Sequence, residues 1–571
     1  MKLNCVLLTV LLCTAINAVA QQSLFIPDTL SGTGPFNLSL NTSTVQFLPG
    51  QLTQTVCFNN YNYLGPTIIL QKGQVANMMV NNQLTDTSTV HWHGLHVPAM
   101  DDGGPHTVIL PGATWSPQFT VMNNASTFWY HPHMHMKTAQ QVMKGAAGLI
   151  IVRDSAEAAL NLPRSYAIDD IPLIVQCQQF DSVNQIMFRG MQDSILMVNG
   201  TINPFLNIPS QVVRMRLLNA SQERNFNFGF TGNKQFYVIG NDGGLLQAPV
   251  AVTRMRLAPG ERAEILADFS GMNGQITYLM SYASEIPMGV QGGPTMPMPP
   301  WAPPMDSPLN GVDFNILQLN IVAQTANPVT AIPASLVTVT PWLESQSNIT
   351  RTINFTADSA MVMDGPFYFN GLSFDMMRID YLIPLNNIEI WSLTNQTMVS
   401  HSFHIHDVQF FVLDRDGIQP LPEEKGYKDV VLVAPNETVR FITKFEDFAD
   451  TTMPYMFHCH MLMHEDDGMM GQFIVLPNAS GISENNSANN FSVYPNPADE
   501  NFNILFNLKE QSDVLMDITD LAGRQVMLLM NDKQNGLVSK KINTSPLLNG
   551  NYFVRLIVNG ITTVQKLNVV H

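Results

Sequence analysis

Short runs of alternating apolar and polar residues dominate the chain, and turn-forming residues separate them. Stretches rich in Val, Ile, Phe and Thr are bounded throughout by Gly, Pro, Asn and Asp, whereas apolar residues at helical spacing are scarce. A period of two places successive side chains on opposite faces of a strand, and many short strands of this kind are typical of sandwiches and barrels. The pattern therefore predicts an all-β fold.

Two strand-and-turn patterns recur in the same order along the chain. The first begins at LQKGQVANMMVNNQL (from Leu70), NIPSQVVRMRLLNAS (from Asn207) and IPLNNIEIWSLTNQT (from Ile383), and the second follows at ILPGATWSPQFTV (from Ile109), LAPGERAEILADF (from Leu257) and VAPNETVRFITKF (from Val433). Such recurrence at domain scale indicates copies of one unit. We expect three related β-domains near residues 24–155, 168–325 and 340–477.

The N-terminal segment has the features of a cleaved secretory signal. Lys2 precedes an apolar run from Val6 to Ala20, which ends in small residues. The run is shorter than the roughly 20 residues that a membrane-spanning helix needs, and no other segment is apolar enough to span a bilayer. We therefore expect residues 1–20 to be a signal peptide, an exported mature chain that begins near Gln21, and no membrane span.

The sequence predicts a linker and a separate domain in the C-terminal part of the chain. Residues 478–490, NASGISENNSANN, are polar and nearly uncharged, which is typical of a linker. Residues 491–571 alternate between strands and Gly or Asn turns, so we expect a small β-sandwich. Its start, FSVYPNPADENFNILFNL, and its end, LLNGNYFVRLIVNGITTVQKLNVV, resemble the C-terminal sorting domain of the type IX secretion system of Bacteroidota.

That resemblance implies recognition by secretion machinery and a final place at the cell surface or in the medium, with the periplasm as the alternative. A carbohydrate-binding module is the other interpretation of this domain.

Composition narrows the classes of partner. The formal net charge is −17 and the isoelectric point lies near 5.1, which disfavours binding to nucleic acid or to an anionic membrane. Removal of the signal would leave Cys57, Cys177 and Cys459, too few for a scaffold built on disulfides. Cys57 and Cys177 could form a disulfide after export or remain small core residues.

Histidines are clustered in pairs of the form His-x-His. Random placement of this number of histidines would give roughly 0.3 such pairs, yet the chain has five. These pairs are His91 with His93, His131 with His133, His133 with His135, His404 with His406, and His458 with His460. In a strand, both members of a pair point to one face. Because no histidine lies between His135 and His401, we expect any metal site to be shared between the first and third domains.

The stretch YMFHCHMLMHEDDGMM, residues 455–470, combines a pair with a cysteine. In a strand, Cys459 would point away from the face that His458 and His460 share. A thiolate, two imidazoles and a weak thioether form the ligand set of a blue copper centre. Cys459, His464 and Met469 supply three of these ligands, and His401 is the natural second imidazole. The remaining eight histidines suit a cluster of three copper ions, whereas the CxxC spacing of structural zinc sites is absent.

At these residues the chain resembles the multicopper oxidases, the family of laccases, cuprous oxidases and bilirubin oxidases. Four family motifs are present: HWHG at 91–94, HPH at 131–133, HSFHIH at 401–406 and HCHMLMHEDDGMM at 458–470. The resemblance covers residues 40 to 477 and implies three cupredoxin-like Greek-key domains. It is most like the three-domain bacterial copper-efflux and spore-coat type.

The resemblance also implies four copper ions and a ligand set for each. The type 1 ion would be held by His401, Cys459, His464 and Met469; the type 2 ion by His91 and His404; one type 3 ion by His93, His131 and His460; and the other by His133, His406 and His458. Family enzymes take single electrons from a small reductant at the type 1 ion, pass them through the Cys-His bridge and reduce dioxygen to water.

Reduction of dioxygen to water consumes protons, and imidazole ligands donate none, so nearby carboxylates are expected. Asp102 and Glu465 match the acidic residues that have this role in the family, and the alternative is that both are solvated loop charges. The further histidines His96, His106 and His135 match no family ligand, and we expect them at the surface or at the rim of the cluster.

The reductant is left open between Cu(I) and phenolic or aryl compounds. The chain has 33 methionines, whose thioethers suit Cu(I), although methionine also fills cores. Met296, Met298 and Met305 in the proline-rich segment 287–308 are candidates for a Cu(I) site. Against this, the long insert of the copper-efflux enzymes is missing, and Thr397 stands where they have an acidic residue. The rival from another class is a copper-binding or electron-transfer protein without oxidase activity, which would keep Cys459 but not the pairs.

Overall fold

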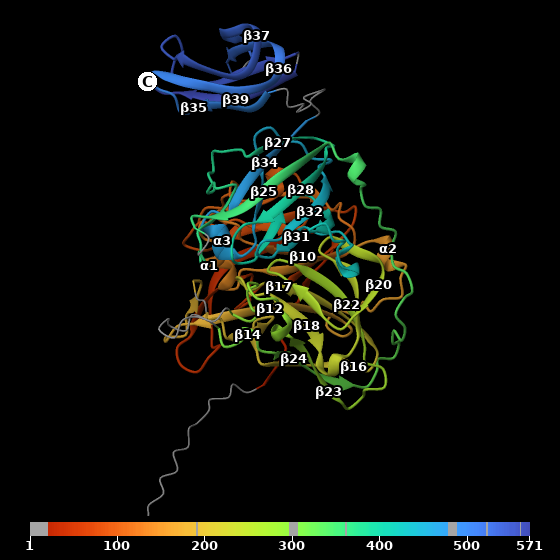
Figure 1. The fold of residues 1–571 in the computed structure, drawn as a ribbon. Coiled ribbons are helices and arrows are strands. Elements are labelled where there is room, and N and C mark those ends of the chain that lie inside the picture. The colour runs from red at the N-terminus through yellow and green to blue at the C-terminus, as the bar shows by residue number, and fades with distance from the viewer. Residues whose placement is uncertain are drawn as a thin grey trace, which may run out of the picture. The chain divides into compact units, whose positions relative to one another are not determined.

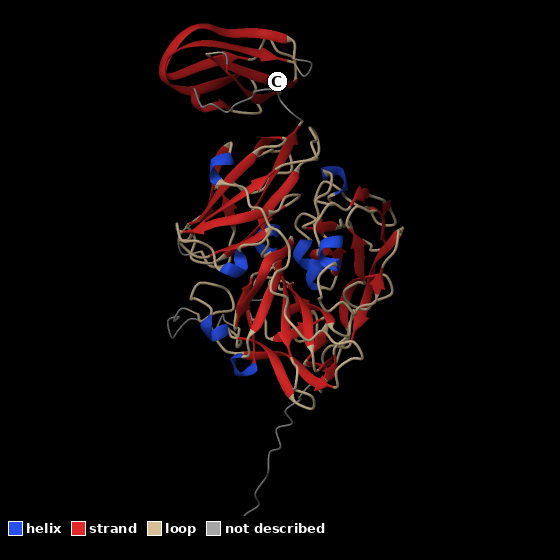
Figure 2. Ribbon diagram, turned by 90° about the vertical axis from the view of Figure 1, so that its right-hand side faces the viewer, coloured by secondary structure: helices blue, strands red, loops and turns tan. Residues whose placement is uncertain are grey.

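The computed structural model describes residues 21–189, 192–295, 307–359, 362–477, 488–520, 523–559 and 561–571. The predicted signal peptide, most of the predicted linker (478–487) and the methionines Met296, Met298 and Met305 lie outside the described residues. Strands make up most of the regular structure (Figures 1 and 2). The all-β prediction is confirmed.

The chain divides into two compact units, residues 1–477 and residues 478–571. Each unit has a hydrophobic core of its own, because the buried residues of the second unit's core all lie between Phe491 and Val569. The cores of the first unit are built from residues between Leu24 and Val475. The first unit contains every candidate metal ligand.

The first domain is a pair of sheets around a shared core. One sheet has the order β4-β3-β6-β8, with β9 also paired to β6, and the other has the order β2-β5-β11-β10-β7. The strands are β2 (Thr29–Leu30), β3 (Phe36–Val45), β4 (Thr53–Phe58), β5 (Thr67–Gln71), β6 (Val75–Asn82), β7 (His91–His93), β8 (Thr114–Trp115), β9 (Gln118–Thr120), β10 (Ser126–His131) and β11 (Gly148–Arg153). In β6 every second residue is buried, as the period of two predicts.

The middle domain has the same two-sheet form. Its first sheet runs β15-β14-β12-β17-β22-β19-β20 with β13 beside β12, and its second runs β1-β16-β24-β23-β18-β21. The strands are β1 (Gln22–Ser23), β12 (Asp170–Phe180), β13 (Ile186–Met187), β14 (Ile195–Val198), β15 (Thr201–Ile202), β16 (Pro204–Pro209), β17 (Val212–Asn219), β18 (Phe226–Phe230), β19 (Phe236–Asn241), β20 (Gly244–Val252), β21 (Met255–Leu257), β22 (Arg262–Asp268), β23 (Ile276–Ser281) and β24 (Phe314–Val322). Residues 22–24 therefore belong to the middle domain, since β1 pairs with β16 and Leu24 packs in that core.

The third domain repeats the arrangement. Its sheets run β26-β25-β28-β32-β30 and β27-β34-β33-β29-β31. The strands are β25 (Ile349–Ala357), β26 (Phe367–Phe369), β27 (Tyr381–Pro384), β28 (Ile388–Asn395), β29 (His401–Ile405), β30 (Phe410–Arg415), β31 (Val430–Val433), β32 (Thr438–Lys444), β33 (Tyr455–Cys459) and β34 (Met470–Leu476). Short helices are α1 (Thr138–Met143), α2 (Ser155–Ala158) and α3 (Leu462–Asp466), with 3-10 turns η1 (Ala99–Asp101), η2 (Thr231–Asn233), η3 (Ala283–Glu285), η4 (Glu344–Gln346) and η5 (Pro422–Glu424).

The second unit is built around one long strand. Its strands are β35 (Ala488–Tyr494), β36 (Asn501–Thr519), β37 (Gln525–Asn543), β38 (Gly550–Val558) and β39 (Ile561–Val569). The first half of β36 pairs with β35 and the second half with β38, while β37 follows β36 along its length. The two halves enclose one core, which includes Phe502, Ile504, Met516 and Val554.

Cys57 and Cys177, which the sequence left open as a disulfide, are both buried free thiols.

Candidate metal centre

Eight histidines converge where the first and third domains meet. They lie on β7, on and just after β10, on and just after β29, and on and just after β33, and the set is His91, His93, His131, His133, His404, His406, His458 and His460. Antiparallel pairing places His91 opposite His131 in the first domain and His404 opposite His458 in the third. None of the eight is more than 1% exposed. The structure therefore brings the paired motifs together from both end domains.

The first group consists of His133, His406 and His458. The Nε2 of His458 lies 3.1 Å from that of His133 and 3.4 Å from that of His406. On the far side of the rings, His406 Nδ1 donates to Asp102 Oδ2 at 2.8 Å and His458 Nδ1 donates to the Cys459 carbonyl at 3.1 Å. Because these oxygens can only accept, the protons of both rings sit on Nδ1. The Nε2 lone pairs then face one another, an arrangement that repels unless a cation lies between them.

The second group consists of His93, His131 and His460. His93 Nδ1 lies 3.2 Å from His460 Nε2 and 3.5 Å from His131 Nε2. His131 Nδ1 donates to the Pro132 carbonyl at 2.8 Å, and His93 Nε2 faces Asp429 Oδ1 at 3.2 Å. The outer nitrogens of these two rings therefore carry the protons, and their inner nitrogens are free. The ring of Trp129 covers this group, with its centre 4.1 Å from that of His131.

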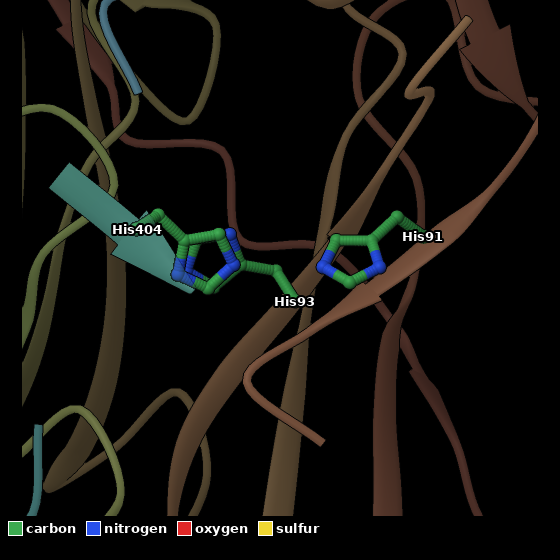
Figure 3. A group of neighbouring side chains, drawn as sticks. All are labelled: His91, His93 and His404. Atoms are coloured by element: carbon green, nitrogen blue, oxygen red, sulfur yellow. The ribbon is translucent and has the colours of Figure 1, made fainter. Parts of the chain in front are cut away.

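The third group is a pair, His91 and His404. Their Nδ1 atoms donate to the backbone carbonyls of Asp102 at 2.9 Å and Asp429 at 2.8 Å. Their Nε2 atoms are buried and have no hydrogen-bond partner. An unpaired buried polar atom costs roughly 1–3 kcal/mol, so two such atoms in one place fit a metal ion. Figure 3 shows both with His93, and the ligand atoms of these three residues lie within 4.8 Å of one another.

Burial keeps six of these eight imidazoles neutral. It lowers the pKa of His93, His131, His404, His406 and His460 well below the usual value, and the neighbouring imidazoles lower it further. Burial likewise lowers the pKa of His133 to about 3. Neutral imidazole is the form that binds copper.

The fourth group consists of His401, Cys459 and His464. Cys459 Sγ lies 3.5 Å from His464 Nδ1 and 3.7 Å from His401 Nδ1, and these two nitrogens are 3.2 Å apart. The thiol thus points away from the face of β33 that carries His458, as a strand requires. Burial raises the pKa of Cys459 to about 12, so a thiolate here depends on a bound cation.

Met469 and Thr397 complete the surroundings of this group. Met469 is fully buried. Its N–H donates to the His464 carbonyl, and its carbonyl accepts from the Cys459 N–H, so its backbone is hydrogen-bonded to two of the ligand residues. Thr397 Oγ1 lies 2.8 Å from His401 Nε2 and 3.0 Å from the Val399 carbonyl. The threonine donates to this carbonyl or to Asn395 Oδ1, 2.8 Å away, and accepts from His401, which leaves His401 Nδ1 free toward Cys459.

Asp102 and Glu465 are 1% exposed and contact the histidines directly. Asp102 accepts from His406, and the Glu465 oxygens lie 3.4 Å from His133 Nδ1 and 3.2 Å from His458 Nδ1. Burial by itself would raise the pKa of Glu465, but these two imidazoles hold it below its usual range. Neither carboxylate is a solvated loop charge.

The three further histidines of the first domain lie outside the four groups. His96 pairs with Asp407 at 2.7 Å and Asp447 at 3.1 Å, His106 bonds Gln472 at 2.7 Å, and His135 packs against Phe374.

Asp429, which contacts both His93 and His404, was not among the residues predicted from the sequence. Its only signal in the sequence is a charged residue directly before the apolar run of β31.

These features define a copper-binding oxidoreductase built from cupredoxin domains. Family models described as multicopper oxidase match residues 40–157, 175–294 and 340–479, and a model described as secretion system C-terminal sorting domain matches residues 492–570. The chain belongs to the multicopper oxidase family and carries a C-terminal sorting domain.

Relatives of known sequence carry two kinds of name. A protein named multicopper oxidase mco from Staphylococcus haemolyticus is 32% identical over 449 residues, which are 77% of this chain and 88% of that protein. A protein named cell division protein FtsP from Escherichia coli is 30% identical over 467 residues, which are 80% of this chain and 93% of that protein.

Solved structures of the family share the fold. The laccase-like multicopper oxidase CueO of Ochrobactrum sp., described with oxidase activity towards lignin model compounds, is 32% identical with a TM-score of 0.70, over 79% of this chain and all of that one. McoA of Aquifex aeolicus is 30% identical with a TM-score of 0.71, over 80% of this chain and all of that one.

The depressed pKa values predict the pH dependence of the copper-free protein. Unfolded histidines take up protons below about pH 6.5, whereas the buried ones do so only near the low pKa values of the folded state, so the unfolded chain binds more protons. The free energy of unfolding should therefore fall by about 1.4 kcal/mol per buried imidazole for each pH unit below that point. Denaturant unfolding of the copper-free protein at several pH values measures this, and a flat profile between about pH 6.5 and 5 would contradict it.

Proposed function

We propose that the protein couples one-electron oxidation of a small reductant at a type 1 copper to four-electron reduction of dioxygen to water at a trinuclear copper cluster. The supporting observation is that ten histidines and one cysteine gather in four buried groups whose free nitrogens face one another. Such ligands select copper by softness and geometry.

Each group fits the ligand set that the family resemblance implies. In this proposal the type 1 ion is bound by His401, Cys459, His464 and Met469; the type 2 ion by His91 and His404; and the two type 3 ions by His93, His131 and His460 and by His133, His406 and His458. When bound, the four copper ions would accept single electrons from the reductant and deliver them to dioxygen.

The chain supplies a short route between the two sites. Cys459 faces one site from β33, and its neighbours His458 and His460 face the other, so a few covalent bonds connect them. His401 is fully buried and its Nε2 is bonded to Thr397, whereas His464 keeps 4% exposure. A reductant would therefore approach at His464.

Asp102 and Glu465 are the proposed proton donors. Both touch the imidazoles of the cluster and neither reaches solvent. In that position each carboxylate oxygen can take up a proton and relay it to reduced oxygen, which imidazole ligands cannot do.

Charges near His464 favour a cationic reductant such as Cu(I). Asp467 follows α3 directly and pairs with Arg189 at 2.5 Å. Burial, and then the charge of Asp364, raise the pKa of Glu223 to about 7. The charge of Asp467 also raises the pKa of both Glu223 and Asp364. Arg189 thus pairs with Asp467, and the carboxyl groups of Asp364 and Glu223 lie close enough to Asp467 to feel its charge. The lignin-related activity of the Ochrobactrum protein supports phenolic compounds as the alternative.

A non-catalytic role is the rival function, because relatives named cell division protein match as well. A protein of that kind has no need for ten converging histidines with unpaired buried nitrogens. The same residues argue against a copper carrier, which would need only the Cys459 group.

The sorting domain supports export by secretion machinery, and we propose the cell surface or the medium as the destination, with the periplasm as the alternative. Among the described residues, no helix is both long and apolar enough to cross a membrane.

Oxygen uptake by the copper-loaded protein tests the reaction. With Cu(I), Fe(II) and a phenol as separate reductants, we expect four equivalents oxidised per dioxygen and no hydrogen peroxide. Cys459→Ser should abolish the blue colour and the oxidation of every reductant, because the thiolate links the two sites. Peroxide as the main product, or full activity in this variant, would contradict the proposal.

Replacement of the carboxylates tests the proton route. Glu465→Gln or Asp102→Asn should lower kcat by about 10²- to 10⁴-fold, because proton delivery is lost. The blue absorption should stay in place, because these carboxylates contact ligands of the trinuclear cluster and not those of the Cys459 group. Steady-state rates across pH check this, and Asp447→Asn at the surface is the control. A rate unchanged at every pH would exclude the residue as a donor.

The carboxyl groups near His464 predict that a cationic and an anionic reductant respond differently to the loss of one negative charge. Asp364→Asn should lower kcat/KM for a cationic reductant by about two- to tenfold and leave it unchanged or raised for an anionic one. Kinetics with ferrocyanide and a cationic phenylenediamine measure the difference, and added salt should reduce it. Equal effects on both reductants would remove the charge argument.

A further inference from the structure

We propose that the middle domain, which contributes no histidine, positions the trinuclear ligands through Arg262 and Asp429. This inference rests on the copper cluster proposed above. Arg262 is the first residue of β22 in the middle domain, and Asp429 directly precedes β31 in the third. Both side chains are fully buried.

Arg262 uses all five of its donors, and its acceptors come from all three domains. Its Nε donates to the Thr127 carbonyl of the first domain at 3.1 Å. Its Nη1 and Nη2 donate to the carbonyls of Gly260 and Asp242 in the middle domain at 3.1 and 2.9 Å. Nη1 also donates to Asp429 Oδ1 and Nη2 to Asp429 Oδ2, each at 2.6 Å. A guanidinium group offers five donors in a planar fork, which lysine cannot reproduce.

Asp429, held in place by Arg262, in turn fixes the orientation of two ligands. Its Oδ1 accepts from His93 Nε2 at 3.2 Å, and its backbone carbonyl accepts from His404 Nδ1 at 2.8 Å. The rings of His93 and His404 overlap in the view of Figure 3. They are stacked, with centres 3.8 Å apart and planes 8° apart. One residue therefore sets which nitrogen is free on a ligand from each end domain.

The glycines nearby show how closely these groups approach the cluster. A Cβ on Gly94 would lie 2.4 Å from Asp429 Oδ2 and 2.7 Å from Arg262 Nη2. A Cβ on Gly260, in the turn before β22, would lie 2.8 Å from the ring of His460. The turn at Gly260 thus lies directly against His460 of the third domain, and the Arg262 side chain lies against Gly94, which directly follows β7 of the first domain.

Stability alone does not account for so many buried charges. Lys428 pairs with Asp242 at 3.0 Å and Glu261 at 2.9 Å, beside the Arg262–Asp429 pair. Buried ion pairs pay a desolvation penalty that apolar residues avoid, so they are weak evidence for stability. Residues that orient metal ligands by hydrogen bonds, in contrast, change metal affinity by about 10- to 100-fold when replaced.

Arg262→Lys tests the proposal on the full chain. At a fixed free copper concentration, the variant should lose the type 2 electron paramagnetic resonance signal and the near-ultraviolet absorption of the type 3 pair, with affinity for these ions lowered about 10- to 100-fold. The blue absorption of the Cys459 group should be unchanged, because Arg262 does not contact it. Asp429→Asn, which keeps the size of the side chain, should behave alike.

Arg214→Lys is the matched control. Arg214 is equally buried in the same domain and pairs with Glu157 and Glu264, but it touches no candidate ligand. The Arg214→Lys substitution should lower the unfolding temperature without selective loss of the type 2 and type 3 signals. If both Arg262→Lys and Asp429→Asn keep these signals, or lose them together with the blue absorption, the inference is wrong. A wild-type protein without these signals would instead refute the proposed function.

Discussion

The structure depends on imidazole nitrogens that face one another across the seam between the first and third domains. Carbonyl and carboxylate oxygens hold the protons of His406, His458 and His131 on the outer side of each ring, so the inner lone pairs have no hydrogen bond to make. Such an arrangement is unfavourable in a dry interior without a cation. Metal binding therefore contributes to the stability of the seam as well as to chemistry.

The alternation of a β-strand joins the two copper sites that we propose. On β33 the thiol of Cys459 and the imidazole of His458 leave the strand on opposite faces, and the antiparallel partner β29 does the same with its own histidines. Two ordinary strands thus place one site on each side of a sheet within a few bonds. The middle domain adds no ligand, yet its turn at Gly260 packs against His460 and its Arg262 donates to the Thr127 carbonyl of the first domain.

Much of this could be predicted from the sequence because it depends on local periodicity. The period of two predicted strands, and the His-x-His pairs predicted shared faces. The absence of histidine from the middle of the chain predicted a site between the end domains. Contacts across domains could not be predicted in this way. Asp429 and Arg262 lie 167 positions apart, and the segment that begins at Gln22 joins the middle domain by a strand too short to show a period.

The most direct test is diffraction from copper-loaded crystals at the copper absorption edge. Four anomalous peaks are expected, three among the eight histidines between the first and third domains and one beside Cys459, His401 and His464. Fewer than three peaks at the seam, or copper bound elsewhere on the chain, would contradict it.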